Sequence, residues 1–294
     1  MEQQPPRLPE RRGIRRGIYV LPSLFTVGTL VCGYYAILST LRAGQMLAAA
    51  GAVTFNPQAT ELAASAAAAL DNASKAIGWA IVADGLDGRI ARLTNTASPF
   101  GRELDSLADL VTFGVAPAVL AYVWGARAIA EAPGLLNTGQ LSHAIPWILT
   151  FFYVICGAAR LARFNIDTVK PATDRRFFVG MPIPAAAGFV AAVVHFFKEP
   201  LISWQLSAVW LVVVAFLGFL MVSHMRYYSF KTLDLRKRRS YLAIIAIGVV
   251  IWGIWFFSEP FLLALGITYA LSGIILRITA RFRPRPPAPE VHAA

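Results

Sequence analysis

The sequence predicts an all-α, polytopic membrane protein, a bundle of about eight transmembrane helices. Composition favours this class, because 57% of the 294 residues are hydrophobic and only 15% are charged, against about a quarter charged in an ordinary soluble domain. The apolar runs also approach the roughly 20 helical residues that cross a bilayer core. These runs are 18–41, 62–92, 101–126, 144–165, 179–198, 204–224, 240–257 and 260–279.

Basic residues gather in every second connection between these runs. They precede the first run, join the second to the third, and follow the fourth, sixth and eighth. By the positive-inside rule, both termini and these connections are expected to be cytoplasmic, in a multi-pass protein of the cell membrane. The formal net charge of +11 does not predict nucleic-acid binding, since the cations do not collect on one face or module.

The two ends of the chain differ in composition from the apolar runs. Residues 1–17 form a basic cytoplasmic segment, and residues 281–294 form a Pro-rich cytoplasmic tail. The N-terminal segment either lies on anionic membrane lipids, at about 1 kcal/mol of attraction per basic residue, or is a solvated tail that only fixes the topology.

Four aspartates interrupt the second and third runs. Asp84 and Asp87 are three residues apart, and Asp105 and Asp109 are four apart, so each pair projects from one helix face. A carboxylate within a membrane helix is costly unless it is paired or faces a wet cavity. Because hard divalent cations prefer oxygen ligands, we expect the four carboxylates to bind Mg²⁺ or Mn²⁺. The alternative is an internal salt-bridge network.

The segment that carries these aspartates has a specific pattern. Residues 84–109 read DGLDGRIARLTNTASPFGRELDSLAD. They fit D-x-x-D-G-x-x-A-R, eight residues, then G-x-x-x-D-x-x-x-D, and the chain therefore resembles the CDP-alcohol phosphotransferase family. The resemblance implies that a phosphatidyl or analogous group passes from a CDP-linked substrate to an alcohol, with release of CMP. The fixed positions are Asp84, Asp87, Gly88, Ala91, Arg92, Gly101, Asp105 and Asp109.

The resemblance also implies roles for these positions. Asp84, Asp87 and Asp105 would ligate one or two divalent ions. Asp109 would be a further metal neighbour and the general base that takes the proton of the acceptor hydroxyl. The residues expected to bind CDP-diacylglycerol are Thr26, Gly88, Ala91, Arg92 and Gly101. The first helix departs from the family's common P-N-x-x-T pattern, because Ser23 stands where the asparagine would be.

Segments outside the signature point to the acceptor. Residues 21–37, 159–165, 181–187 and 221–235 resemble the membrane-integral bacterial phosphatidylserine synthases, which implies that L-serine is the acceptor. It also implies a homodimer and a six-helix core at 18–235. The apolar runs 240–257 and 260–279 lie outside the resemblance and are expected to form two additional helices at 236–280. Arg160 and Arg163, three residues apart, are candidates to bind the serine carboxylate or a lipid phosphate. The alternative is that both arginines only fix topology at the interface.

Other functions are open on the residues alone. A sister enzyme of the family could use glycerol 3-phosphate, an inositol phosphate or choline. A membrane prenyltransferase also holds Mg²⁺ with aspartates, but its acidic motifs would lie far apart in the sequence. A cation transporter would need acidic residues along a path and internal pseudo-symmetry, and neither is visible.

The remaining polar and aromatic residues are expected to be structural. The histidines have no metal-ligand spacing and are assigned no chemistry. Aromatic residues near the span ends are expected to form interfacial belts. These are Trp124, Trp147, Trp204, Tyr227 and Tyr228.

Overall fold

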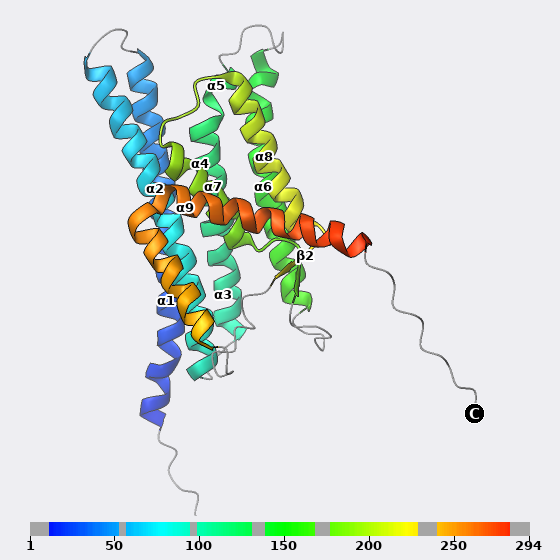
Figure 1. The fold of residues 1–294 in the computed structure, drawn as a ribbon. Coiled ribbons are helices and arrows are strands. Elements are labelled where there is room, and N and C mark those ends of the chain that lie inside the picture. The colour runs from blue at the N-terminus through cyan, green and yellow to red at the C-terminus, as the bar shows by residue number, and fades with distance from the viewer. Residues whose placement is uncertain are drawn as a thin grey trace, which may run out of the picture.

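The computed structural model describes residues 12–52, 57–94, 99–130, 139–167, 177–228 and 240–282. These residues are almost entirely helical, and Figure 1 shows long helices side by side with the C-terminal helix laid across them. The predicted all-α polytopic class is confirmed. Among the described residues, five segments are long and apolar enough to cross a membrane: Leu24–Gly51, Phe100–Gly125, Ala144–Ile166, Trp204–Val222 and Trp252–Thr279.

The first two helices form an antiparallel hairpin. Helix α1 spans Arg12–Ala52 and α2 spans Pro57–Thr94, and they lie side by side along their length (Figure 1). Their interface contains buried alanines such as Ala36 and Ala73, and small side chains let membrane helices approach closely. The hydroxyl of Ser39 donates across the interface to the carbonyl oxygen of Ala69 at 2.8 Å.

The third predicted run is a continuous helical segment in which an α-helix passes into a π-helix and then into α-helix again. It consists of α3 (Pro99–Asp109), a π-helix η1 (Leu110–Val115) and α4 (Ala116–Gly125), followed by the short α5 (Arg127–Ala130). The π-helix and α4 form the part of this run that lies in the core: Thr112, Phe113 and Gly114 of η1 are buried, and so are most residues of α4.

Three further helices complete the bundle: α6 (Gly139–Asp167), α7 (Ile183–Phe197) and α8 (Trp204–Val222). Trp210 of α8 meets Trp124 edge-on, with ring centroids 5.1 Å apart, and donates its indole N–H to the carbonyl oxygen of Ala121. The prediction that Trp124 belongs to an interfacial belt is wrong, because only 2% of its surface is exposed. Trp147, by contrast, is exposed.

A two-stranded antiparallel ribbon, which the sequence did not predict, joins the ends of α7 and α8. Strand β1 (Phe177–Val179) pairs with β2 (Arg226–Tyr228). Gly180 follows β1 with a φ of +81°, and a Cβ there would lie 2.2 Å from the carbonyl oxygen of Met221. Both the left-handed conformation and the close approach therefore require glycine.

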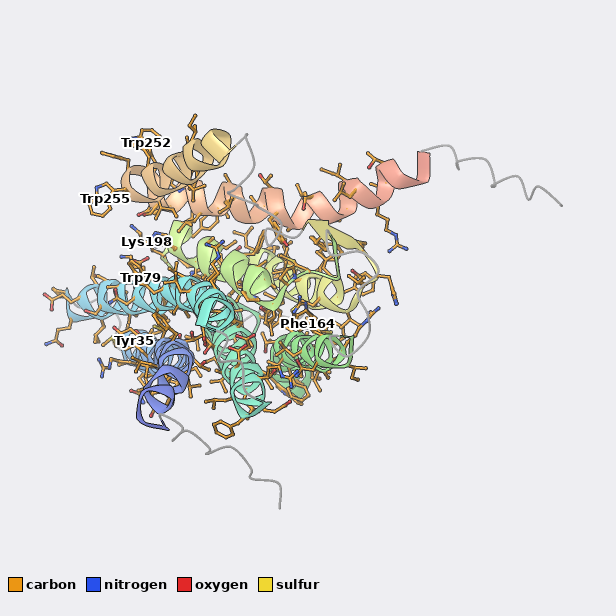
Figure 2. The ribbon with its side chains drawn as sticks, turned by 90° about the horizontal axis from the view of Figure 1, so that it is seen from below. Tyr35, Trp79, Phe164, Lys198, Trp252 and Trp255 are labelled. Atoms are coloured by element: carbon orange, nitrogen blue, oxygen red, sulfur yellow. The ribbon has the colours of Figure 1, made fainter. Side chains whose placement is uncertain are left out.

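The last two predicted spans correspond to the two helical segments of α9 (Ser240–Phe282), which are separated by a kink at Phe257, where φ is −138° and ψ is 47°. Its second half runs across the bundle in Figure 1 and packs on α7 and β2. Figure 2 shows Trp252 and Trp255 on the outer side of the first half. A pair of separate transmembrane helices at 236–280 stays a prediction.

Tyr227 of β2 is buried beneath α9, so its expected place in an aromatic belt is also wrong. Its hydroxyl donates to the carbonyl oxygen of Ala270 at 3.4 Å, and burial raises its pKa to about 12. At Gly273 a Cβ would lie 2.3 Å from the Tyr227 ring, so α9 can reach the ribbon only because that position is glycine.

Candidate metal and substrate site

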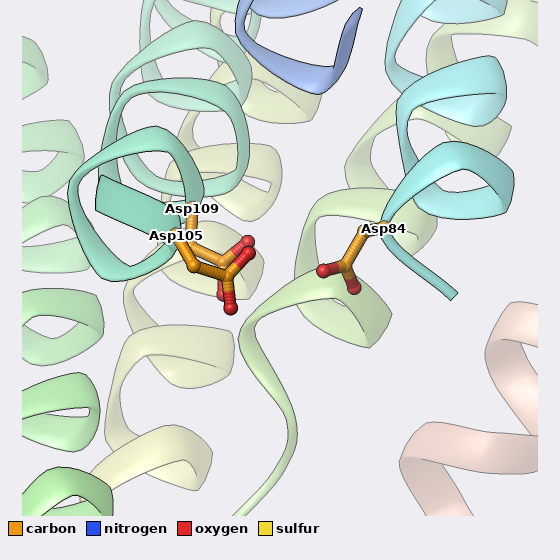
Figure 3. Close-up of side chains that lie close together, drawn as sticks. All are labelled: Asp84, Asp105 and Asp109. Carbon is orange, nitrogen blue, oxygen red and sulfur yellow. The ribbon is translucent and has the colours of Figure 1, made fainter. Parts of the chain in front are cut away.

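Three carboxylates converge where α2 faces α3. Asp84 comes from α2, and Asp105 and Asp109 project towards it from consecutive turns of α3 (Figure 3). One oxygen from each lies within 4.8 Å of the other two, and no other such group occurs among the described residues. Two oxygens bonded to one divalent ion at roughly 2.0–2.6 Å are at most about 5 Å apart, so this spacing fits a shared cation.

The environment of Asp109 supports the same interpretation. Its Oδ1 is buried, and within the described part of the chain it has no hydrogen-bond partner. Asp84 and Asp105 also repel its negative charge. A buried acceptor without a donor and a group of like charges are each unfavourable, and a bound cation would relieve both.

The fourth predicted ligand, Asp87, has a different neighbour. It is buried on α2 and accepts a hydrogen bond from the hydroxyl of Thr26 on α1, and it is not part of the three-carboxylate group. Thr26, predicted to contact the nucleotide, therefore joins α1 to the acidic segment of α2. The roles of Asp87 as a metal ligand and of Thr26 as a nucleotide contact stay predictions.

The predicted substrate-binding glycines lie beside the carboxylates. A Cβ placed on Gly88 would meet nothing within 4 Å, so close packing against the described helices does not require glycine there. The role of Gly88 in substrate binding stays a prediction. Gly101 is half-buried near the start of α3. Ala91 and Arg92 fall within α2 and Ser23 within α1, but their side chains lie outside the described part.

Helix α6 brings one of the two candidate arginines to the acidic group. The guanidinium of Arg160 attracts the carboxylate of Asp109, and its Nε is buried without a hydrogen-bond partner among the described residues. Arg163 is exposed. The structure therefore favours Arg160 over Arg163 as the arginine of the site.

One link between α6 and α3 was not predicted. The side-chain amide of Asn165 donates to the hydroxyl of Ser106 at 3.0 Å. Ser106 adjoins Asp105, and Asn165 ends the segment 159–165 that drew attention to the arginines. That adjacency was the only sequence signal for the contact.

Comparisons with known proteins agree with this geometry. The family described as CDP-alcohol phosphatidyltransferase matches residues 19–220. A CDP-diacylglycerol–serine O-phosphatidyltransferase of Helicobacter pylori is 41% identical over 177 residues, which are 58% of this chain and 68% of that protein. A protein of the same name from Methanocaldococcus jannaschii is 35% identical over 208 residues, which are 71% of this chain and 85% of that protein. Another from Saccharomyces cerevisiae is 40% identical over 124 residues, which are 40% of each chain. The chain belongs to the CDP-alcohol phosphatidyltransferase family.

Proposed function

We propose that this protein transfers the phosphatidyl group of CDP-diacylglycerol to the hydroxyl of L-serine, giving phosphatidylserine and CMP. The observation that carries the proposal is the convergence of Asp84, Asp105 and Asp109 within a chain whose relatives bear the name of that reaction. The choice of serine over another alcohol rests on the names of those relatives and on the resemblance of the segments outside the signature.

The acidic group suits a divalent cation. The donors are all carboxylate oxygens, their spacing fits ligands of one ion, and Asp109 keeps a buried oxygen without a donor from the described residues. Asp84, Asp105 and Asp109, with Asp87 nearby, would hold Mg²⁺ or Mn²⁺. Such an ion supplies charge neutralisation for the diphosphate and for the departing CMP.

The protein's own residues would carry the proton and position the substrates. Asp109 accepts the proton of the serine hydroxyl, the hydroxyl oxygen forms a bond to the phosphorus that carries diacylglycerol, and the bond from that phosphorus to the CMP oxygen breaks. General-base help of this kind typically contributes about 10²–10⁴-fold. Gly88, Ala91 and Gly101 leave room for the nucleotide, and Arg92 holds the diphosphate.

Arg160 is the stronger candidate for the acceptor side. Its guanidinium faces Asp109 from α6, so an anion that it binds would lie beside the general base. A serine carboxylate bound there places the serine hydroxyl near Asp109, since guanidinium groups bind carboxylates in two-point fashion. Arg163, exposed one turn further along α6, would contact a lipid phosphate.

We also propose that both termini of the protein lie on the cytoplasmic side of the membrane and that the protein forms a homodimer.

The test is CMP release and lipid product analysis with purified protein, CDP-diacylglycerol and Mg²⁺ or Mn²⁺. Serine, glycerol 3-phosphate, inositol phosphate and choline are supplied separately, to the wild type and to Asp109→Asn. Serine-dependent phosphatidylserine that disappears in the variant is the expected result. Turnover only with another alcohol would support phosphatidyl transfer but reject serine as the acceptor. If no acceptor gives CMP release, the proposed phosphatidyltransferase activity is rejected.

A further inference from the structure

The π-helix η1 begins at the residue that follows Asp109. It occupies Leu110–Val115, between the acidic helix α3 and the buried helix α4. π-Helical turns are rare, and they occur frequently at functional sites. The question is what this wider turn does for the carboxylates that precede it.

A regular helix here would bring two incompatible sets of side chains onto one face. Residues three and four apart share a helix face, so Asp105 and Asp109 would point the same way as Thr112 and Ala116. Both of the latter are fully buried in the bundle core. One extra residue in the turn rotates the preceding segment by about 100° relative to the following one. The π-turn therefore lets α4 keep its buried face while α3 directs its carboxylates towards Asp84.

Two side-chain hydroxyls connect the π-turn to two other helices. Thr112 of η1 donates to the carbonyl oxygen of Thr29 on α1, and Tyr153 of α6 donates to the carbonyl oxygen of Phe113 in η1, each at 3.1 Å. Thr112, Phe113 and Tyr153 are completely buried. Because water does not reach these groups, the hydroxyls are the donors that keep the contacts in place.

The backbone of α1 is also fitted to this turn. A Cβ on Gly33 would lie 2.4 Å from the Thr112 hydroxyl oxygen and 2.8 Å from its Cα. The π-turn thus contacts both α1 and α6, and neither contact involves a residue of the acidic group.

We propose that Tyr153 and Thr112 are positioning residues for the proposed reaction: they hold η1 in its π-turn and so direct Asp105 and Asp109 towards Asp84. Neither is assigned a contact with substrate or metal. Loss of a hydroxyl lets η1 relax towards a regular helix, which turns the carboxylates away from their shared centre. Misplacement of reacting groups by about 1 Å can cost about 10²-fold in rate.

The test uses pairs of variants that lose the same group. Tyr153→Phe removes a hydroxyl that contacts η1, and Tyr227→Phe removes a buried hydroxyl that donates to Ala270 of α9 instead. Thr112→Val and Thr40→Val form a second pair, since the Thr40 hydroxyl is equally buried but donates within its own helix to Ala36. Thr112→Ser keeps the hydroxyl and should rescue the loss caused by Thr112→Val.

We expect Tyr153→Phe and Thr112→Val to lower kcat by about 10- to 100-fold. They should also raise the Mn²⁺ concentration for half-maximal activity about tenfold, while the control of each pair stays within about twofold of wild type. A purely structural role would lower the thermal stability of both members of a pair and leave kcat and the Mn²⁺ requirement of the folded enzyme unchanged. That result overturns the proposal.

A second measurement separates this proposal from the proposed function. Mn²⁺-induced thermal stabilisation of the purified protein reports on the carboxylates without any acceptor alcohol. If serine is the wrong acceptor, wild-type protein still gains stability from Mn²⁺, and Tyr153→Phe and Thr112→Val should need about tenfold more of the ion. Equal Mn²⁺ titrations of the two π-turn variants and their controls would reject the positioning role whatever the acceptor is.

Discussion

Helix α2 contributes to two polar clusters that differ in what surrounds their carboxylates: other carboxylates in one, and hydrogen-bond donors in the other. In the acidic cluster (Asp84, Asp105 and Asp109), three carboxylates converge on one another. In the His195 network (Asp71, Lys75, His195 and Ser258), one carboxylate is surrounded by donors. The Asp71 carboxylate accepts from Lys75 at 2.7 Å and from Nδ1 of His195, and Nε2 of His195 lies 3.1 Å from the Ser258 hydroxyl.

The difference indicates which cluster is built for a ligand. The His195 network joins α2, α7 and α9 through contacts that are complete within the protein, so it stabilises the fold. The acidic cluster gathers negative charge and leaves a buried oxygen of Asp109 without a donor from the described residues, and a cation from outside would relieve both. Substitutions in the two clusters should therefore have opposite effects on activity and on stability.

The largest expected effect is on catalysis at the acidic cluster. Asp105→Asn should lower CMP release by at least about 10²-fold, because it removes a charge that would hold the metal. The same change should leave the Tm in EDTA unchanged or raise it, since it reduces repulsion among the three carboxylates. A marked fall in the Tm without metal would show that the cluster is structural instead.

Metal addition should separate the clusters next. At about 100 times its Kd, a bound ion stabilises the folded protein by about 2.7 kcal/mol. Mn²⁺ should thus raise the Tm of the wild type and of Asp71→Asn, and it should do little for Asp105→Asn. Equal shifts in all three proteins would place the metal elsewhere.

Breaking the His195 network should act on stability alone. Asp71→Asn leaves His195 and Lys75 without their carboxylate, and hydrogen bonds to charged groups contribute about 1.5–3 kcal/mol. We expect a lower Tm with CMP release per folded molecule close to wild type. Loss of turnover in fully folded protein would contradict the division between the clusters.

The smallest effect concerns the outer member of the network. Ser258→Ala removes only the contact to Nε2 of His195, which should cost about 0.5–1.5 kcal/mol. Ser272→Ala is a suitable control, because the Ser272 hydroxyl donates within α9 to the carbonyl oxygen of Tyr269. Chemical denaturation of the two variants gives the comparison, and equal losses would mean that the link to His195 adds nothing.

The acidic cluster was predictable because its information is local. Spacings of three and four residues predict each aspartate pair on one helix face, and the two pairs lie on consecutive helices. Asp87 is the member that this local pattern does not account for, because it meets Thr26 of α1 instead. The split of the C-terminal apolar region was equally local, since the predicted boundary coincides with the bend at Phe257.

What the sequence did not reveal depends on distant contacts. His195 contacts Asp71, which is 124 residues away in the sequence, and no residue pattern near either of them predicts the contact. Trp124 was placed at an interface because it lies near a span end, but Trp210 and Phe197 cover it. The π-turn is also invisible to periodicity, because its donors Thr112 and Tyr153 come from different helices.

The family match stops at residue 220, two residues before α8 ends at Val222. Strand β2, the buried Tyr227 with its partner Ala270, and Ser258 of the His195 network all lie beyond residue 220. The residues that the family match covers are therefore fewer than the residues that pack together in this fold. A chimera joined at residue 220 would interrupt α8, lose strand β2 and lose the packing of α9 on α7. Chimeras between family members should therefore keep this chain through the end of α9.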